Sequence, residues 1–73
     1  MKRFHDEDGT AWDAVVGRAS WGVFHLLFIP VDEGPIRQVP LEATSADEAE
    51  RMLAGEDQSA LVRLLGRSRP RDP

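Results

Sequence analysis

The pattern of apolar residues along this chain centres on one stretch, residues 20–30, with the sequence SWGVFHLLFIP. Its β-branched and aromatic residues and its closing proline are typical of a β-strand. Because successive side chains of a strand point to opposite faces, the stretch divides into two sets: Trp21, Val23, His25, Leu27 and Ile29 on one face, and Phe24, Leu26 and Phe28 on the other. Both faces of this predicted strand are therefore apolar.

Three shorter stretches predict further strands beside it. An Asp-Gly pair at residues 8–9 predicts a tight hairpin turn after the first of them. Pro40 cannot donate a ladder hydrogen bond, which places the last strand at the edge of the sheet or ends it before the proline. The predicted strands are residues 3–5, residues 10–16 with the Trp12 face toward the core, and residues 36–41, which return antiparallel.

The second half of the chain predicts two short helices. Ser45 and Glu48 form a capping box, in which the Ser45 hydroxyl accepts from the Glu48 amide and the Glu48 carboxylate accepts from the Ser45 amide. Apolar residues then recur at helical spacing, and Gly55 is expected to end this helix in a left-handed cap. A second helix is expected to begin at a cap formed by Asp57 or Ser59.

Leucines at the i, i+3, i+4 spacing form one face of the second helix, which Gly66 is expected to end. The chain is thus expected to be a single α+β domain over residues 1–66. Its architecture is an antiparallel meander of about four strands in the order 1-2-3-4, followed by a C-terminal helical hairpin packed on one face of the sheet. Residues 67–73 are expected to form an Arg/Pro tail that is too polar to pack.

The length of 73 residues sets a limit on stability, since a domain of this size buries only about 60 % of the surface that it exposes when unfolded. Without any cysteine, the chain has neither a disulfide framework nor a thiolate metal site. No stretch is apolar enough to span a bilayer as a helix, and the first residues lack the apolar segment of a signal peptide. We expect a cytoplasmic protein with no membrane partner and no cofactor.

Charge is distributed unevenly along the chain. Residues 1–57 hold twelve acidic and five basic residues, a net of −7, whereas residues 58–73 hold one acidic residue and four arginines, a net of +3. An acidic body repels the phosphates of nucleic acid, so a nucleic-acid partner is disfavoured. The four arginines either form a cationic helix end and a solvated tail or, as an alternative function, contact phosphate or an acidic partner; they are Arg63, Arg67, Arg69 and Arg71.

The two predicted helices carry one narrow apolar stripe each, enough to cover one face of a sheet about 20 Å wide. Burying an exposed aliphatic or aromatic side chain contributes roughly 1.5–3 kcal/mol, so the other face gains from being covered. Either the sheet curls over itself, or two copies pair, or a different protein covers it. We therefore expect a non-catalytic protein–protein interaction module, as a subunit of a larger assembly or as a homodimer. The expected contact residues, on whichever face is exposed, are Trp21, Val23, Phe24, Leu26, Phe28 and Ile29.

Candidate chemical sites are few. The cluster at residues 5–8 is rich in carboxylates but lacks the spacing of a calcium loop, so we interpret it as a solvated turn and expect no metal site. His25 is a packed histidine with one hydrogen bond or, if a carboxylate faces it across the sheet, a pH-sensitive element. Trp12 and Trp21 are interpreted as core side chains rather than as a platform for a stacked ligand.

Catalytic chemistry has no clear candidate in the sequence. The serines lie in predicted turns, caps or the tail, and there is no glycine-rich phosphate loop. We expect no catalytic residues and no enzymatic activity.

The length and the order of strands followed by helices resemble MbtH-like proteins, the small partners of peptide-synthesising adenylation domains. In this chain Ser20-Trp21 is followed by Gly22, where that family has a proline, and no Gly-Trp pair occurs later. The resemblance is therefore one of layout and gives no residue a role.

Overall fold

A computed structural model describes residues 1–18 and 22–71 of the chain. Within these residues the strands are β1 (Lys2–His5), β2 (Ala11–Arg18), β3 (Phe24–Pro30) and β4 (Arg37–Leu41), followed by the helices α1 (Ala46–Gly55) and α2 (Gln58–Arg67) and the two-residue strand β5 (Arg69–Pro70).

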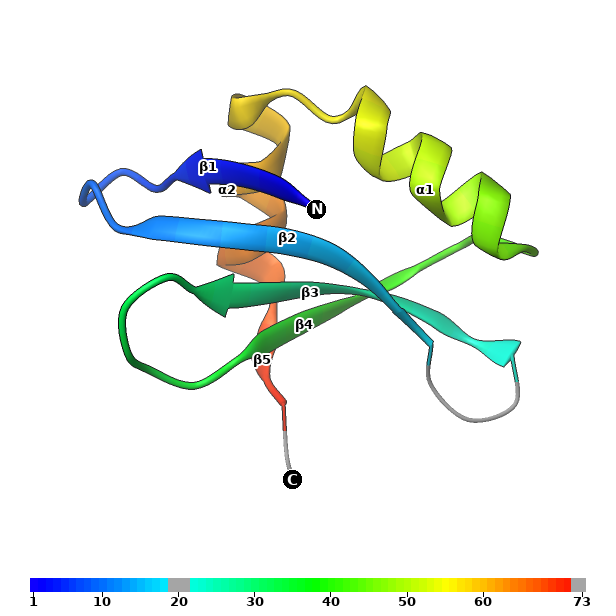
Figure 1. Cartoon of the computed structure of the whole chain (residues 1–73), viewed down its shortest axis with the longest axis horizontal. Coiled ribbons are helices and arrows are strands. Elements are labelled where there is room, and N and C mark those ends of the chain that lie inside the picture. Colours follow the sequence, from blue (N-terminus) through cyan, green and yellow to red (C-terminus); the bar gives the residue numbers. More distant parts are fainter. Residues whose placement is uncertain (19–21, 72–73) are drawn as a thin grey trace.

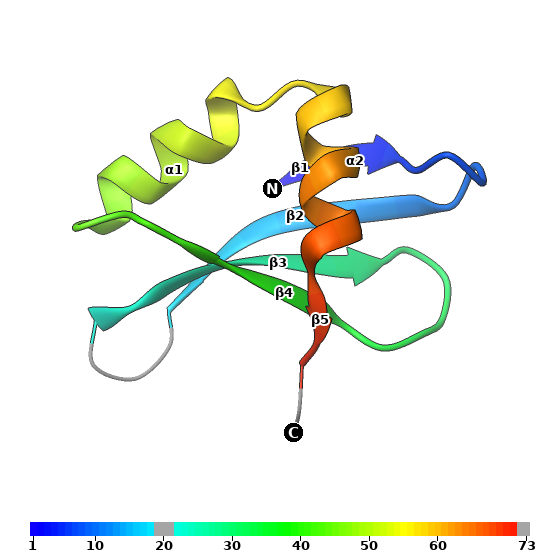
Figure 2. The ribbon, with the colours of Figure 1, turned by 180° about the vertical axis from the view of Figure 1, so that it is seen from behind.

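The sheet is an antiparallel meander with the strand order β1-β2-β3-β4-β5. Helix α1 lies against β2 and β3, and α2 crosses the sheet against β1 and β4. Figure 1 looks onto the sheet with α2 behind it, and Figure 2 shows α2 in front. The predicted α+β class, the meander of four strands and the two C-terminal helices packed on the sheet are confirmed.

The hydrophobic core lies between the sheet and the helices. Burial alternates along β3, where Phe24, Leu26 and Phe28 are buried and the side chains between them are partly exposed. The rings of Phe4 and Phe28 meet edge to face, with centroids 5.7 Å apart. As predicted, the Trp12 side of β2 faces this core. The core cluster comprises Phe4, Ala14, Leu26, Phe28, Val39, Leu53 and Leu61, with Trp12 and Val16 packed against it.

Asp6 organises the turn between β1 and β2. Its Oδ1 accepts the amides of Asp8 and Thr10, and its Oδ2 accepts the indole N–H of Trp12, each at 2.9 Å. Gly9 has a φ of +83°, which favours glycine. Because β1 and β2 pair up to His5 and Ala11, five residues separate the strands. The predicted turn is therefore present but is longer than a two-residue hairpin.

The predicted strand over residues 20–30 is shorter in the structure. Ser20 and Trp21 lie outside the described residues, and β3 begins only at Phe24. Gly22 has a φ of +75°, so the backbone is not extended there. Strand β2, predicted over residues 10–16, runs from Ala11 through Arg18.

Pro40 lies within β4, opposite His25 of β3. On the other side of β4, β5 pairs with Arg37 and Gln38 and reaches no further. The prediction that this strand is the edge of the sheet or ends before the proline is therefore wrong for the strand as a whole, since β5 lies beyond β4 and β4 runs to Leu41. At Pro40 itself, however, the outer side of β4 has no described neighbour, as a proline requires.

Half of the predicted capping box of α1 is present. The Oγ of Ser45 accepts the Glu48 amide at 3.1 Å, as predicted. The Glu48 carboxylate, however, accepts the Thr44 hydroxyl at 3.2 Å rather than the Ser45 amide. The start of the helix is therefore predicted correctly, and one of its two reciprocal bonds is not.

The left-handed cap predicted at Gly55 is wrong. Gly55 is the last residue of α1, its φ is not positive, and Glu56 comes next in an extended conformation. The ammonium group of Lys2 on β1 donates to the carbonyl oxygens of Ala54 and Glu56. A lysine side chain from the sheet thus satisfies carbonyl oxygens at the C-terminal end of α1. In a left-handed glycine cap, backbone amides would satisfy such groups.

Helix α2 begins where predicted and ends later. The Oδ1 of Asp57 accepts the Ala60 amide at 2.8 Å, so Asp57 rather than Ser59 is the cap. Gly66 does not end the helix, which continues to Arg67. Gly66 can adopt helical angles at a modest energetic cost, so the packing of α2 on the sheet is enough to keep this residue in the helix.

The prediction of an unpacked tail after Gly66 is also corrected. Ser68 is buried, and Arg69–Pro70 pair with β4 as the strand β5. The Arg71 amide donates to the Ile36 carbonyl oxygen at 2.8 Å, which continues this pairing. Backbone hydrogen bonds to β4 hold the segment in spite of its polar composition.

Candidate functional site

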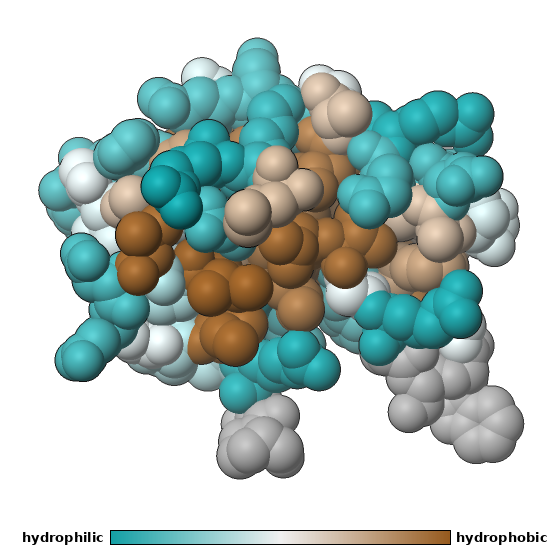
Figure 3. All heavy atoms as spheres, viewed as in Figure 1, coloured by the Kyte–Doolittle hydropathy of each residue, from teal (hydrophilic) through white to brown (hydrophobic). Residues whose placement is uncertain are grey.

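Four aliphatic side chains lie together on the face of the sheet opposite the helices, which we call the open face. Val15 of β2 lies beside Leu27 of β3, Ile29 is on the same side of β3, and Ile36 directly precedes β4. All four are partly exposed, and none belongs to the core cluster. Figure 3 shows hydrophobic side chains gathered on this face, over the middle of the sheet. No helix or strand within residues 1–18 and 22–71 lies over them.

Leu27 packs over Gly17 of the neighbouring strand. A Cβ added at Gly17 would come within 2.7 Å of the Leu27 Cδ1, closer than real contacts allow. The side chain of Leu27 therefore occupies the space that any larger residue at position 17 would need. Leu27 is thus packed against Gly17, while no element in the described part of the chain covers it from the solvent side.

The structure divides the predicted contact residues between the two faces. Phe24, Leu26 and Phe28 are between 0 % and 4 % exposed, so as contact residues they are corrected: they lie under the helices and offer a partner no surface. Ile29 lies on the open face, and Val23, 45 % exposed, precedes β3. Trp21 lies outside the described residues.

Three arginines line the border of the open face beside β4, and we call them the arginine edge. Arg67 ends α2, Arg69 lies in β5 and Arg71 comes directly after it, and all three are exposed. Arg67 and Arg69 line a groove of about 330 Å³ together with His25 and Gln38. None of the described residues that line this groove is acidic. The arginine edge is thus locally positive, although the whole chain carries a net charge of −4.

His25 lies on the open face, paired with Gly17 on one side and Pro40 on the other. Its Nδ1 is buried and has no hydrogen-bond partner among the described residues. The facing carboxylate that a pH-sensitive element requires is missing from the described residues that line the groove.

The opposite border of the open face carries an ion pair. The guanidinium of Arg3 on β1 donates from Nε to Oδ1 of Asp13 at 2.9 Å and from Nη2 to Oδ2 at 3.2 Å. The hydrogen bond and the charge of Arg3 hold the pKa of Asp13 below its usual range. Since each group already has a partner, this border offers a docking molecule less net charge than the arginine edge does.

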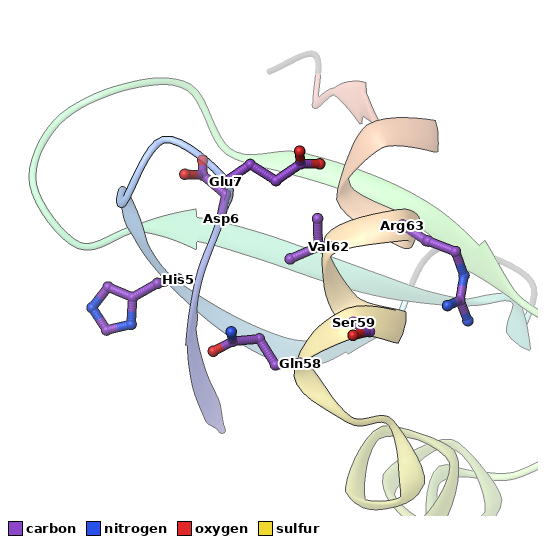
Figure 4. Close-up of a pocket in the computed structure, with 7 residues that line it drawn as sticks. All are labelled: His5, Asp6, Glu7, Gln58, Ser59, Val62 and Arg63. Atoms are coloured by element: carbon purple, nitrogen blue, oxygen red, sulfur yellow. The ribbon is translucent and has the colours of Figure 1, made fainter.

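A second cavity, of about 410 Å³, lies between the β1–β2 turn and α2. Figure 4 shows Gln58 and Val62 pointing from α2 toward the turn, whereas Arg63 points away from it. Arg63 lines this cavity and not the groove at the arginine edge, so the four predicted arginines do not form one site. The side chain of His5 points away from α2 (Figure 4). The described residues contain no group of three or more His, Cys, Asp or Glu residues that could hold a metal ion.

The predicted contact set omits several open-face residues. Leu27 could be found from the sequence, because it has the same parity as Ile29 on one strand. Val15, Ile36 and Gln38 required the pairing register, which places them beside β3 residues that are distant in sequence.

Comparisons of the chain with protein-family models, with curated proteins and with solved structures give no match. Among residues 1–18 and 22–71, no helix is both long and apolar enough to pass through a membrane. The geometry of the open face is therefore the basis on which a function is proposed.

Proposed function

We propose that this protein is a non-catalytic, cytoplasmic protein-binding module whose open face docks onto an apolar protein surface. One observation carries the proposal: Val15, Leu27, Ile29 and Ile36 lie side by side on a sheet face that no other described element covers.

Two physical considerations support it. Contiguous apolar patches on a small soluble protein are typical of interaction sites, whereas single exposed apolar side chains are ordinary. Burying the exposed part of each aliphatic side chain contributes a fraction of the roughly 1.5–3 kcal/mol that complete burial gives. A partner that covers the patch therefore stabilises a small domain whose own core is limited.

The proposal is tested with the full-length chain as bait in an extract of its source organism. We compare the wild type with Leu27→Asp, which places a charge in the middle of the open face, and with Ala46→Asp as the matched control. Ala46 is exposed at the first position of α1, where an acidic residue is favourable. Quantitative mass spectrometry measures the proteins that each bait retains, and circular dichroism checks that each variant is folded.

Partners retained by the wild type and by Ala46→Asp, and lost from Leu27→Asp, support docking through the open face. Equal retention by all three baits, or no specific retention by the wild type, contradicts it.

Contact with phosphate through the arginine edge is a second candidate function. The observation that favours it is the groove in which Arg67 and Arg69 lie with Gln38, without an acidic residue among its described lining. Phosphate contacts predict binding that weakens steeply with salt and is lost in a variant combining Arg69→Ala and Arg71→Ala. Point substitutions are preferable to deleting residues 67–73, because Ser68 is buried and β5 belongs to the sheet.

A further inference from the structure

The charges around the open face are arranged in two groups. The β1–β2 and β3–β4 turns lie at the same end of the sheet (Figure 1), and they carry exposed carboxylates at Glu7 and Asp8 and at Asp32 and Glu33. The arginine edge runs along the β4–β5 side of the same face. The apolar patch is therefore bordered by negative charge at one end and by positive charge along one side.

We propose that the partner of the open face is a second copy of this chain, packed sheet to sheet so that the turn carrying Asp32 and Glu33 of each copy lies against the arginine edge of the other. This inference rests on the proposed function and adds the identity of the partner.

Symmetry makes the arrangement self-consistent. In a twofold dimer the same patch is used by both copies, so a contact between residue i and residue j occurs twice. A twofold axis in the plane of contact, passing through the apolar patch, turns one copy over and exchanges the two sides of the axis. The axis runs obliquely to the strands, between the acidic turn and the arginine edge. The patch of Val15, Leu27, Ile29 and Ile36 then meets the same patch of the other copy, while the acidic turn of each copy crosses to the arginine edge of the other.

The two kinds of contact have different effects. Apolar burial at the centre supplies most of the free energy of association. Charge pairs at the rim contribute less, but they determine the orientation. An axis parallel to the strands would bring the two acidic turns together, and an axis perpendicular to the strands would bring the two arginine edges together. The axis that exchanges the end of the strands with the side of the sheet lies at about 45° to the strands. The two sheets therefore lie about 10 Å apart with strands crossing at nearly right angles, the orthogonal class of sheet packing.

The open face is large enough for such a dimer. A stable interface buries about 800 Å² on each partner. The accessible surface of the described structure is 5061 Å², so the requirement is roughly one sixth of it. The molecule extends 33 × 28 × 18 Å, and the view down its shortest axis in Figure 1 looks onto this face, so the sheet offers one of the broadest sides of the molecule.

The experiment measures the self-association of the purified full-length chain by sedimentation equilibrium. The first variant combines Asp32→Arg with Glu33→Arg, and the second combines Arg69→Glu with Arg71→Glu. The matched control for the first combines Glu42→Arg with Glu50→Arg, which makes the same change in net charge at exposed positions outside both contact regions. Leu27→Asp tests the apolar centre, and circular dichroism checks the fold of every variant.

We expect the wild type and the control to dimerise, and Leu27→Asp to raise the dissociation constant roughly 30-fold or more. Each charge-reversed variant alone opposes like charges at both rim contacts and is expected to weaken the dimer roughly tenfold. An equimolar mixture of the two variants restores opposite charges at both contacts, so a heterodimer of near wild-type affinity is expected.

A monomeric wild type throughout the concentration range overturns this inference, while partners that Leu27→Asp loses in the bait experiment would still support the proposed function. A mixture no tighter than the separate variants overturns the orientation and therefore the proposal as stated. A dimer that tolerates Leu27→Asp in a folded protein contradicts both the inference and the use of the open face.

Discussion

Arg37 of β4 is bonded to Ser68, the residue directly after α2: Nε donates to the Ser68 Oγ at 2.8 Å, and Nη2 donates to the Ser68 carbonyl oxygen at 2.6 Å. The Ser68 hydroxyl donates in turn to the Leu65 carbonyl oxygen at 2.5 Å. One side chain thus joins the sheet to the end of α2 and to the start of β5. The position of the arginine edge depends on this connection.

Arg37→Leu is expected to lower the free energy of unfolding by about 1.5–3 kcal/mol, because it removes two hydrogen bonds from a charged group and leaves the Oγ and the carbonyl oxygen of the buried Ser68 without that donor. Urea denaturation measures the change, and amide exchange at Arg71 should become faster as β5 loosens. Arg51→Leu, at an exposed position of α1, is the control and is expected to stay within about 0.5 kcal/mol of the wild type. Equal effects of the two substitutions would show that the Arg37–Ser68 bond does not hold the segment.

Two adjacent leucines distinguish the two faces of β3. Leu26 is 1 % exposed in the core, whereas Leu27 is partly exposed on the open face. Leu26→Ala is expected to destabilise the protein by about 2–5 kcal/mol through lost burial and a residual cavity. Leu27→Ala is expected to reduce stability by less than about 1.5 kcal/mol in the monomer, since part of its surface already meets water. Thermal or urea unfolding at low protein concentration measures both changes. A larger loss of stability from Leu27→Ala than from Leu26→Ala would mean that Leu27, not Leu26, is the core side chain.

Two glycine substitutions, one in α1 and one in the β1–β2 turn, test whether α1 ends without a left-handed glycine. Gly55 is helical and has open space where a Cβ would lie, so Gly55→Ala is expected to stabilise the protein by about 0.4–1 kcal/mol. Gly9, with a φ of +83°, should respond in the opposite direction, and Gly9→Ala is expected to reduce stability by about 1–2 kcal/mol. Urea denaturation of both variants decides the matter. Destabilisation by Gly55→Ala would support the left-handed cap that the sequence predicts.

Asp6 makes stability depend on pH in the acidic range. The hydrogen bond from the Trp12 indole, and then those from the amides of Thr10, Asp8 and Gly9, lower the pKa of Asp6 in the folded state. A carboxyl whose folded pKa is lowered contributes stability above its ordinary pKa of about 3.9, and this contribution is lost as the pH falls through the folded value. Asp6→Asn is therefore expected to be less stable than the wild type at neutral pH, with the difference shrinking in strong acid. The unfolding midpoints of both proteins, from neutral pH down to strong acid, measure this difference in stability. A difference that stays constant with pH would show that the ionised Asp6 carboxylate is not the stabilising group.

The fold was largely predictable because its signals are local. Strand alternation, the Asp-Gly turn, the Ser45 cap and the Asp57 cap each depend on residues within a few positions of one another. The helix ends were not predictable in the same way. Gly55 and Gly66 carry the local signal of a left-handed cap, but contacts from β1 and β4, distant in sequence, determine the backbone conformation at the end of each helix.

The sequence by itself determined that the longest strand is apolar on both sides and that the chain has only two short helices to cover it, because alternation and helical spacing are properties of the chain alone. Only the tertiary structure decided which side is core. The helices pack on the side of Phe24, Leu26 and Phe28, where Leu26 and Phe28 form one core cluster with Phe4, Leu53 and Leu61. It also decided that Val15, Leu27, Ile29 and Ile36 lie beside the arginine edge, since register and the return of β5 to β4 bring together residues that no local pattern connects.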